Sequence, residues 1–211
     1  MEFNTSKNLG GIGAILLVIG SLAIFGTGYS GILWLIGGIL VLIALSGLGG
    51  YYKESGIFNN VIFAIVVDIV GVVVLVGLAI FVTLSSLFSL PGIPTDWSDT
   101  TAVTNFFTNY FSNGNNWNTI MGWIGGLVVT WVIFIVFISI GGYLIWKSLR
   151  TLGAKSGVGL FGTAGLLIFI GAILTIIFIG LIIVWIGALL LAIAFFQLKP
   201  QTAQMAPPPP P

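Results

Sequence analysis

Side chains able to carry chemistry are scarce in this chain. Its 211 residues include five acidic and six basic side chains, with no cysteine and no histidine. That composition leaves out disulfides, thiolate nucleophiles, imidazole bases and nearly all transition-metal sites. One carboxylate stands apart from the others, because Asp68 lies inside the long apolar run from Ile57 to Phe88. Asp68 is therefore the first position at which to look for function.

The depth of Asp68 is what makes it unusual. It lies about ten residues, or roughly 15 Å, from the inner end of its predicted helix, which places it near the middle of a bilayer. A carboxylate there is costly and usually faces the interior of a helical bundle. Ala64 and Gly71 share its face, so a neighbouring helix can come close. No Lys or Arg lies at that depth, so we expect a protonated acid that donates to a hydroxyl or carbonyl group. The deep polar candidates for that bond are Ser21, Thr130, Trp131 and Thr175.

Three interpretations of Asp68 remain open at this stage. It could form a structural hydrogen bond between helices, act in a proton or cation relay, or line a wet space without a role. The predicted intramembrane site comprises Asp68, Thr130 and Trp131. We expect no catalytic residue, metal or cofactor, because no nucleophile–base pair or carboxylate cluster falls within the apolar segments. Asp96 and Asp99 alone would make a weak site.

Composition assigns the chain to the membrane proteins. It is 58% hydrophobic and 5% charged, whereas a soluble domain carries about 25% charged residues. The mean hydropathy is +1.20. The apolar segments are continuous rather than alternating, which excludes a β-barrel. The net charge of +1 gives no case for nucleic acid as a partner.

The apolar segments are long enough for six helices that cross a membrane, since about 20 apolar residues span the roughly 30 Å hydrocarbon layer. We predict spans at about 9–25, 32–49, 58–86, 120–146, 160–179 and 181–198. The last two come from one apolar stretch that is too long for a single helix, and we divide it at Gly180. A basic loop is expected at Lys147–Gly159. The predicted fold is all-α, a polytopic bundle of six transmembrane helices in one domain over residues 1–198.

Two polar segments lie outside these spans. In the outer segment, residues 91–118, the stretch Ser98–Phe111 places aromatic side chains at helical spacing, and Ser98 or Asp99 could cap its start. We expect a short helix on the outer interface, or a lid over an outward cavity. Residues 199–211 end in a proline run, which predicts a disordered cytoplasmic tail.

Orientation follows from the basic side chains. With six spans and both ends on one side, all of them fall on that same side: Lys7, Lys53, Lys147, Arg150, Lys155 and Lys199. The positive-inside rule makes that side cytoplasmic. The sequence therefore predicts a multi-pass protein of the cell membrane with both termini in the cytoplasm, and with Asp96 and Asp99 facing outward.

The two ends of the chain look related. A shift of 151 positions brings Gly20 onto Gly171, and a shift of 150 brings Gly37 onto Gly187. The paired helices cross the membrane in the same direction, which predicts a parallel repeat of a helical hairpin. Small residues four apart, such as Gly122 and Gly126, serve either packing within the chain or a homodimer face.

Several segments together resemble one family. They are LGGIGAILLVIG near the start, YYKESGIFNN at residues 51–60, the run from Gly142 to Gly180 that begins GYLIWKSLRTLGAKSG, and the closing LLLAIAFFQL. In these motifs the chain resembles the archaeal membrane-protein family named domain of unknown function 996. The resemblance covers both ends and the two cytoplasmic loops. It implies a membrane protein from an archaeal source, and it carries over no activity and no functional residue.

Two classes of function remain open. One is a structural or accessory component of the archaeal cytoplasmic membrane. The other is a small transporter or channel that uses Asp68 as a proton or cation site. Polar side chains within the spans are few, which favours the first class and a protein that is not an enzyme. The expected partners are the lipid bilayer and either a second copy of the chain or another membrane protein.

Overall fold

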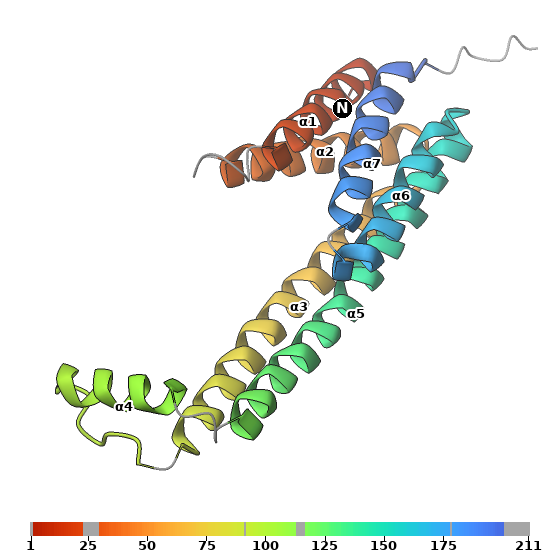
Figure 1. Cartoon of the computed structure of the whole chain (residues 1–211). Helices are drawn as coiled ribbons and strands as arrows, with labels where there is room; N and C mark the ends of the chain where they lie inside the picture. The colour runs from red at the N-terminus through yellow and green to blue at the C-terminus, as the bar shows by residue number, and fades with distance from the viewer. Residues whose placement is uncertain (1, 23–29, 91, 113–116, 178, 201–211) are drawn as a thin grey trace, which may run out of the picture. The chain divides into compact units, whose positions relative to one another are not determined.

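The computed structural model describes residues 2–22, 30–90, 92–112, 117–177 and 179–200, and the regular structure within these ranges is helical with no strand (Figure 1). The helices are α1 (Phe3–Leu22), α2 (Ser30–Tyr51), α3 (Ser55–Phe88), α4 (Thr100–Ser112), α5 (Trp117–Ser156), α6 (Leu160–Leu174), the short 3₁₀ helix η3 (Thr175–Ile177) and α7 (Ile179–Gln197). The all-α prediction is confirmed. The end predicted for the first span and most of the proline-rich tail lie outside the described residues.

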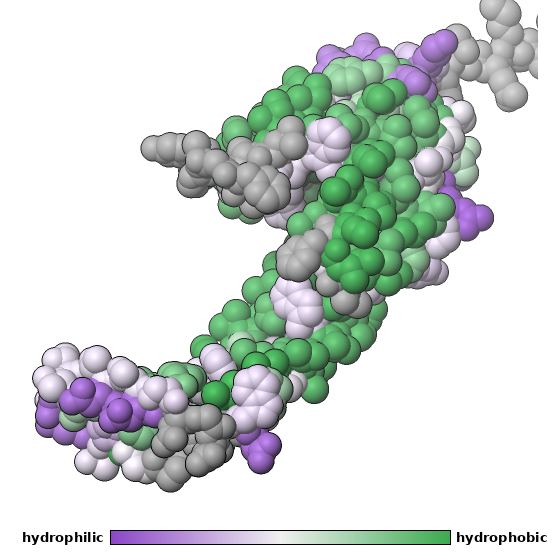
Figure 2. Space-filling view, in the orientation of Figure 1, coloured by the Kyte–Doolittle hydropathy of each residue, from purple (hydrophilic) through white to green (hydrophobic). Residues whose placement is uncertain are grey.

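The long helices have the surface of a membrane protein. Among the described residues, four helices are long and apolar enough to cross a bilayer, namely α2, α3, α5 and α7. Large apolar side chains on α3 are open to the surroundings, with Phe63 61%, Val73 66% and Phe81 68% exposed. Figure 2 shows such residues covering most of the visible surface of the long helices. Because that surface would be unfavourable in water, the chain is a membrane protein. The number six for its spans is not established by helix length.

The predicted basic loop at Lys147–Gly159 is wrong over most of its length, because α5 continues to Ser156. Leu149 and Leu152 in this segment are 1% and 0% exposed. Their spacing gives the polar segment a buried face, and that face keeps it helical beyond the apolar run. The turn that follows is short and contains Gly157, whose φ of 74° suits glycine.

The long C-terminal apolar stretch divides into two helices, as predicted. The break comes earlier than Gly180, since α6 ends at Leu174 and η3 follows. The hydroxyl of Thr175 donates to the carbonyl oxygens of Gly171 and Ala172. A hydroxyl bonded in this way accompanies bending of a helix, which fits the change of helix type at Thr175.

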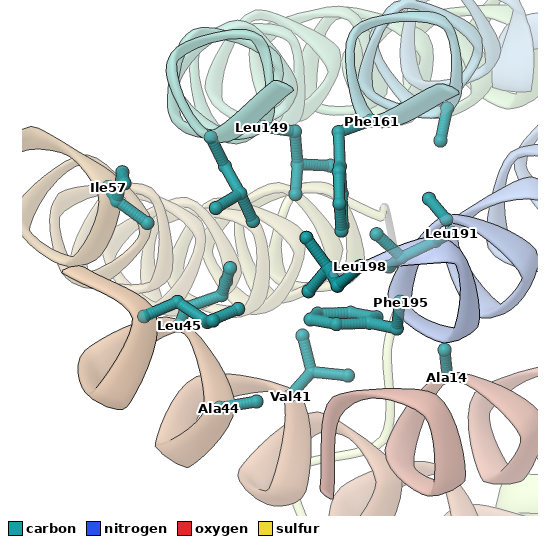
Figure 3. Close-up of a cluster of buried hydrophobic side chains, with 14 of the residues drawn as sticks. Ala14, Val41, Ala44, Leu45, Ile57, Leu149, Phe161, Leu191, Phe195 and Leu198 are labelled. Carbon is teal, nitrogen blue, oxygen red and sulfur yellow. The ribbon is translucent and has the colours of Figure 1, made fainter. Parts of the chain in front are cut away.

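The chain forms two compact units. The first comprises Met1–Asp68 and Ile138–Pro211, and the second comprises Ile69–Phe137. The core of the first unit is a cluster of buried apolar side chains contributed by α1, α2, α3, α5, α6 and α7 (Figure 3). At its centre the rings of Phe161 and Phe195 meet edge to face, with centroids 5.1 Å apart. Leu48, Leu152 and Leu198 are completely buried beside them.

Glycines allow the helix pairs of the first unit to approach closely. A Cβ on Gly37 of α2 would lie 2.7 Å from the carbonyl oxygen of Gly13 and 2.9 Å from the nitrogen of Leu17, both in α1. A Cβ on Gly187 of α7 would lie 3.1 Å from the carbonyl oxygen of Ala164 and 3.2 Å from the nitrogen of Ile168, both in α6. The same kind of contact therefore joins α1 to α2 and α6 to α7.

In the second unit, α3 and α5 pack on each other through glycine. A Cβ on Gly71 would lie 2.5 Å from the Cβ of Phe137, and one on Gly126 would lie 2.7 Å from Val82 Cγ1. Gly126 thus serves packing within the chain, which is one of the two roles considered for the Gly122–Gly126 pair. No atom lies within 4 Å of a Cβ placed on Gly122.

The helix predicted within Ser98–Phe111 is confirmed as α4, and its position on the outer side stays a prediction. Asp99 caps it, because its Oδ1 accepts from the backbone nitrogens of Thr101 and Ala102 at 3.0 Å each. Asp96 Oδ1 accepts from the Ser98 hydroxyl at 2.6 Å and from the Ser98 nitrogen at 2.9 Å. Both bonds hold the pKa of Asp96 below its usual value, and the bond from the Ser98 hydroxyl has the larger effect.

Candidate functional site

Asp68 lies on α3 within the first unit and is partly buried. Its Oδ1 atom is enclosed and has no hydrogen-bond partner among the residues that the structure describes. The hydrogen bond expected from the sequence is therefore not seen at this oxygen. A buried polar atom without a partner is rare in proteins, which keeps Asp68 the first candidate for function.

Two adjacent glycines of α5 create the space around Asp68. A Cβ on Gly141 would overlap the Asp68 carboxyl group. A Cβ on Gly142 would lie 3.2 Å from the Cβ of Ala172 and 3.3 Å from the Cα of Phe169, both in α6. The Gly141–Gly142 pair thus lets α5 contact α3 on one side and α6 on the other. The carboxyl group occupies the volume that a side chain at residue 141 would fill.

Thr130 and Trp131 belong to the second unit, whereas Asp68 belongs to the first. Thr130 is 3% exposed, and its hydroxyl donates to the carbonyl oxygen of Gly126 at 2.9 Å within α5. Trp131 is 44% exposed, and its ring centroid lies 5.7 Å from that of Phe134. The grouping of these three residues into one site stays a prediction.

The other deep hydroxyls are also bonded within their own helices. Ser21 donates to the carbonyl oxygen of Val18 at 2.8 Å, and Thr175 donates to α6 as described above. A hydroxyl that donates to its own helix keeps oxygen lone pairs free, so it could still accept a bond from a protonated acid. Across the described ranges, no three His, Cys, Asp or Glu side chains form a group that could hold a metal ion.

A set of polar contacts near the turns of the first unit was missed by the sequence reasoning. Lys155 and Glu54 form an ion pair at 3.3 Å, which connects the end of α5 to the turn between α2 and α3. The buried Ser148 hydroxyl donates to the carbonyl oxygen of Ile57, and Lys7 Nζ donates to that of Leu198 at 2.8 Å. Opposite charges at Glu54 and Lys155 were the signal available, but their pairing depends on tertiary structure.

Comparison with known proteins places the chain in a family. The model of the family described as "Protein of unknown function (DUF996)" matches residues 33–189. The chain belongs to the DUF996 family. An uncharacterized protein of Methanocaldococcus jannaschii, MJ1644, is 31% identical to it over 198 residues, covering 94% of each chain. No solved structure matches. The family resemblance seen in the sequence motifs is confirmed, and the matched DUF996 region contains Asp68 together with Gly141 and Gly142.

Proposed function

We propose that this DUF996 protein is a structural or accessory component of the archaeal cytoplasmic membrane and is not an enzyme. The observation that carries the proposal is the closed apolar core of the first unit. Six helices contribute to it, and side chains such as Phe161, Phe195 and Leu198 are completely buried there (Figure 3). A permeation path needs polar or wet surface through such a core. The described core is a cluster of apolar side chains, and the buried Ser148 hydroxyl is bonded to the carbonyl oxygen of Ile57, a member of that cluster.

The proposal includes six spans with both termini in the cytoplasm. Four long helices supply four of the spans, and α1 and the α6–η3 segment supply the other two. The one-sided distribution of Lys and Arg supports this orientation. The proposed partners are the lipid bilayer and a second membrane protein or a second copy of the chain, whose contact would use the exposed apolar helix faces.

The proposal also includes the internal repeat. It is supported by the glycine contacts of the two terminal hairpins, because the atoms that approach Gly37 and Gly187 belong to residues related by the same shifts of 150 and 151 positions. Equivalent buried triplets support extending the repeat to three hairpins. A small residue, a large one and a leucine are buried toward the end of α2 (Ala44, Leu45 and Leu48), toward the end of α5 (Ser148, Leu149 and Leu152), and at the end of α7 and directly after it (Ala194, Phe195 and Leu198).

The accessory role is tested by purification from native membranes. The tagged protein is solubilised in a mild detergent, and the proteins that purify with it are identified by mass spectrometry. We expect one other membrane protein to purify with it in a fixed ratio. A variant with a charge on an exposed apolar face, Val73→Lys, should lose that companion while it remains inserted. A protein that purifies alone and transports ions in liposomes would contradict the accessory role.

A proton or cation site at Asp68 is the second candidate function, and the unpartnered Oδ1 atom favours it. Liposomes that contain the protein and an internal pH dye separate the two roles. If the protein is accessory, wild type and Asp68→Asn should leak protons at the same rate as empty liposomes. If Asp68 carries protons, the wild type should acidify the liposomes under a pH gradient and the Asn variant should not.

A further inference from the structure

A groove runs along α2 where it faces the start of α3. It has a volume of about 730 Å³, and its walls include Ile39, Ile43, Gly47, Gly50, Phe58 and Ile62. A second hollow of about 360 Å³ continues from it and shares Ser46, Gly50 and Phe58. All of these residues belong to the first unit. The groove and the hollow share lining residues, so together they form one elongated site on the surface of the first unit.

The site changes in character along its length. The part lined by Ile39, Ile43 and Ile62 is apolar, and it lies on the side of the groove away from the turn between α2 and α3. The part near the turn is polar, because Lys53, Ser55 and Asn59 line it and are exposed, and the partly buried Glu54 lines it as well. Tyr51 lines the groove between the two parts. Tyrosine favours the headgroup level of a membrane, which sets the polar part at that level and the apolar part among the hydrocarbon chains.

Lys53 supplies a cation at the polar end of the site. Glu54 lines the same end of the site, and its carboxylate forms an ion pair with Lys155 at 3.3 Å. Lys53 itself makes no ion pair in the part of the chain that is described. An exposed ammonium group beside hydroxyl and amide side chains at the headgroup level is complementary to an anionic phosphate.

Glycine at residues 47 and 50 keeps the groove open. A Cβ on Gly50 would meet no atom within 4 Å, so the space there is empty of protein. The turn between α5 and α6 offers a comparison, since Lys53 and Gly157 are the two turn residues with φ near 52° and 74°. When Lys53 is aligned with Gly157, Thr151 is equivalent to Gly47 and Ala154 is equivalent to Gly50. The groove thus has glycine at two lining positions where the other turn carries side chains.

We propose that this site binds one anionic phospholipid, with a hydrocarbon chain in the groove along Ile39, Ile43 and Ile62 and the phosphate at Lys53. A second protein helix is the less suitable occupant, because it would have to present an anionic end to Lys53 and an apolar face to the groove at the same time. The bound lipid fills the space between α2 and α3 that no side chain fills. This inference goes beyond the accessory role and depends only on insertion in a membrane.

The test is native mass spectrometry of the full chain after equilibration with equal amounts of phosphatidylglycerol and phosphatidylcholine in detergent. Wild type is expected to retain one phosphatidylglycerol in preference to phosphatidylcholine. Lys53→Gln should reduce that preference about fivefold, the size of effect expected for one Lys at a membrane surface. Lys147→Gln removes an equally exposed cation that does not line the site, and it should leave the preference unchanged.

A second pair of variants tests the groove itself. Gly50→Leu should fill it and abolish retention of the lipid, whereas Gly38→Leu should not. Gly38 is on the same helix, does not line the groove, and also has no atom within 4 Å of an added Cβ. Equal retention of the two lipids by wild type, or equal effects of the variants within either pair, would overturn the proposal. The proposal would also be overturned if the wild type is a dimer that Gly50→Leu makes monomeric without a change in bound lipid. The occupant of the groove would then be a second copy of the chain.

Discussion

Asp68 and Gly141 share one volume between α3 and α5, and this pairing explains how a carboxyl group fits inside a bundle of apolar helices. The residue opposite has no side chain, and the carboxyl group fills the space that results. Close approach of the two helices then encloses Oδ1 without giving it a partner. Packing and polarity are thus in conflict at this position, and such conflicts are more common at functional sites than elsewhere.

Gly141→Ala should destabilise the protein by about 1–3 kcal/mol, because overpacking forces side chains from their preferred rotamers. Asp68→Ala removes the carboxyl group and should recover most of that loss in the double variant. Thermal unfolding in detergent measures both effects. Gly122→Ala is the control, since its added methyl group meets no atom within 4 Å. Simple additivity of the Gly141 and Asp68 changes would show that the two residues do not share this space.

Asp96 is the second residue whose properties follow from its immediate contacts. The Ser98 hydroxyl and the Ser98 nitrogen donate to it and lower its pKa. A carboxylate whose folded-state pKa is depressed stabilises the fold above its unfolded-state pKa, and that contribution is lost as the pH falls through the folded-state value. Ser98→Ala should raise the Asp96 pKa toward its usual value. Carbon-13 NMR of the labelled carboxyl group measures the shift, and an unchanged titration would show that the backbone bond alone sets it.

At the scale of the helices, glycine decides which faces meet. The α1–α2 and α6–α7 pairs use Gly37 and Gly187 in the same way, although neither helix pair has a strongly amphipathic sequence. Without a contrast of polar and apolar faces, close backbone approach at small residues becomes the main determinant of packing in a membrane. The positions of glycine therefore carry much of the information about helix contacts in this chain.

Gly37→Ala should cost more stability than Gly187→Ala, each within about 1–3 kcal/mol. The reason is that the added Cβ at residue 37 lies 2.7 Å from a backbone oxygen, whereas at residue 187 the nearest atom is Ile168 Cγ1 at 2.9 Å. An isoleucine side chain can adjust more readily than a backbone. Gly38→Ala has open space and should be neutral or stabilising. Unfolding temperatures of the three variants in one detergent give the order, and the reverse order would contradict these contacts.

At the scale of the whole molecule, the remaining question is how the chain crosses the membrane. The four long helices do not fix the direction of threading, and the proposed orientation comes from the basic residues. Cysteine at residue 53 or 150 should resist a membrane-impermeant thiol reagent in intact cells, whereas cysteine at residue 104 should react. Thr104 is exposed on α4. Lysed cells provide the control for reactivity. Labelling at residue 53 in intact cells would reverse the orientation.

The sequence by itself determined the class of protein. Apolar runs broken by short polar segments could only be helices in a membrane, since backbone groups must be satisfied within each segment there. It also predicted α4, its cap and the division of the C-terminal stretch, because these depend on neighbours along the chain. The DUF996 motifs were recognisable for the same reason, as they are local runs of residues. Asp68 could be selected as a candidate from the sequence alone, because a carboxylate within an apolar run is visible without a structure.

Tertiary structure decided the contacts between distant residues. The extension of α5 through the expected loop depends on Leu149 and Leu152 finding a buried place, which only the neighbouring helices provide. The glycine opposite Asp68, the Glu54–Lys155 pair and the groove beside Lys53 each require two segments to meet. In a chain that is largely Leu, Ile, Val, Phe and Gly, many helix faces look alike in sequence. Which faces meet is settled by the fit of their surfaces in three dimensions.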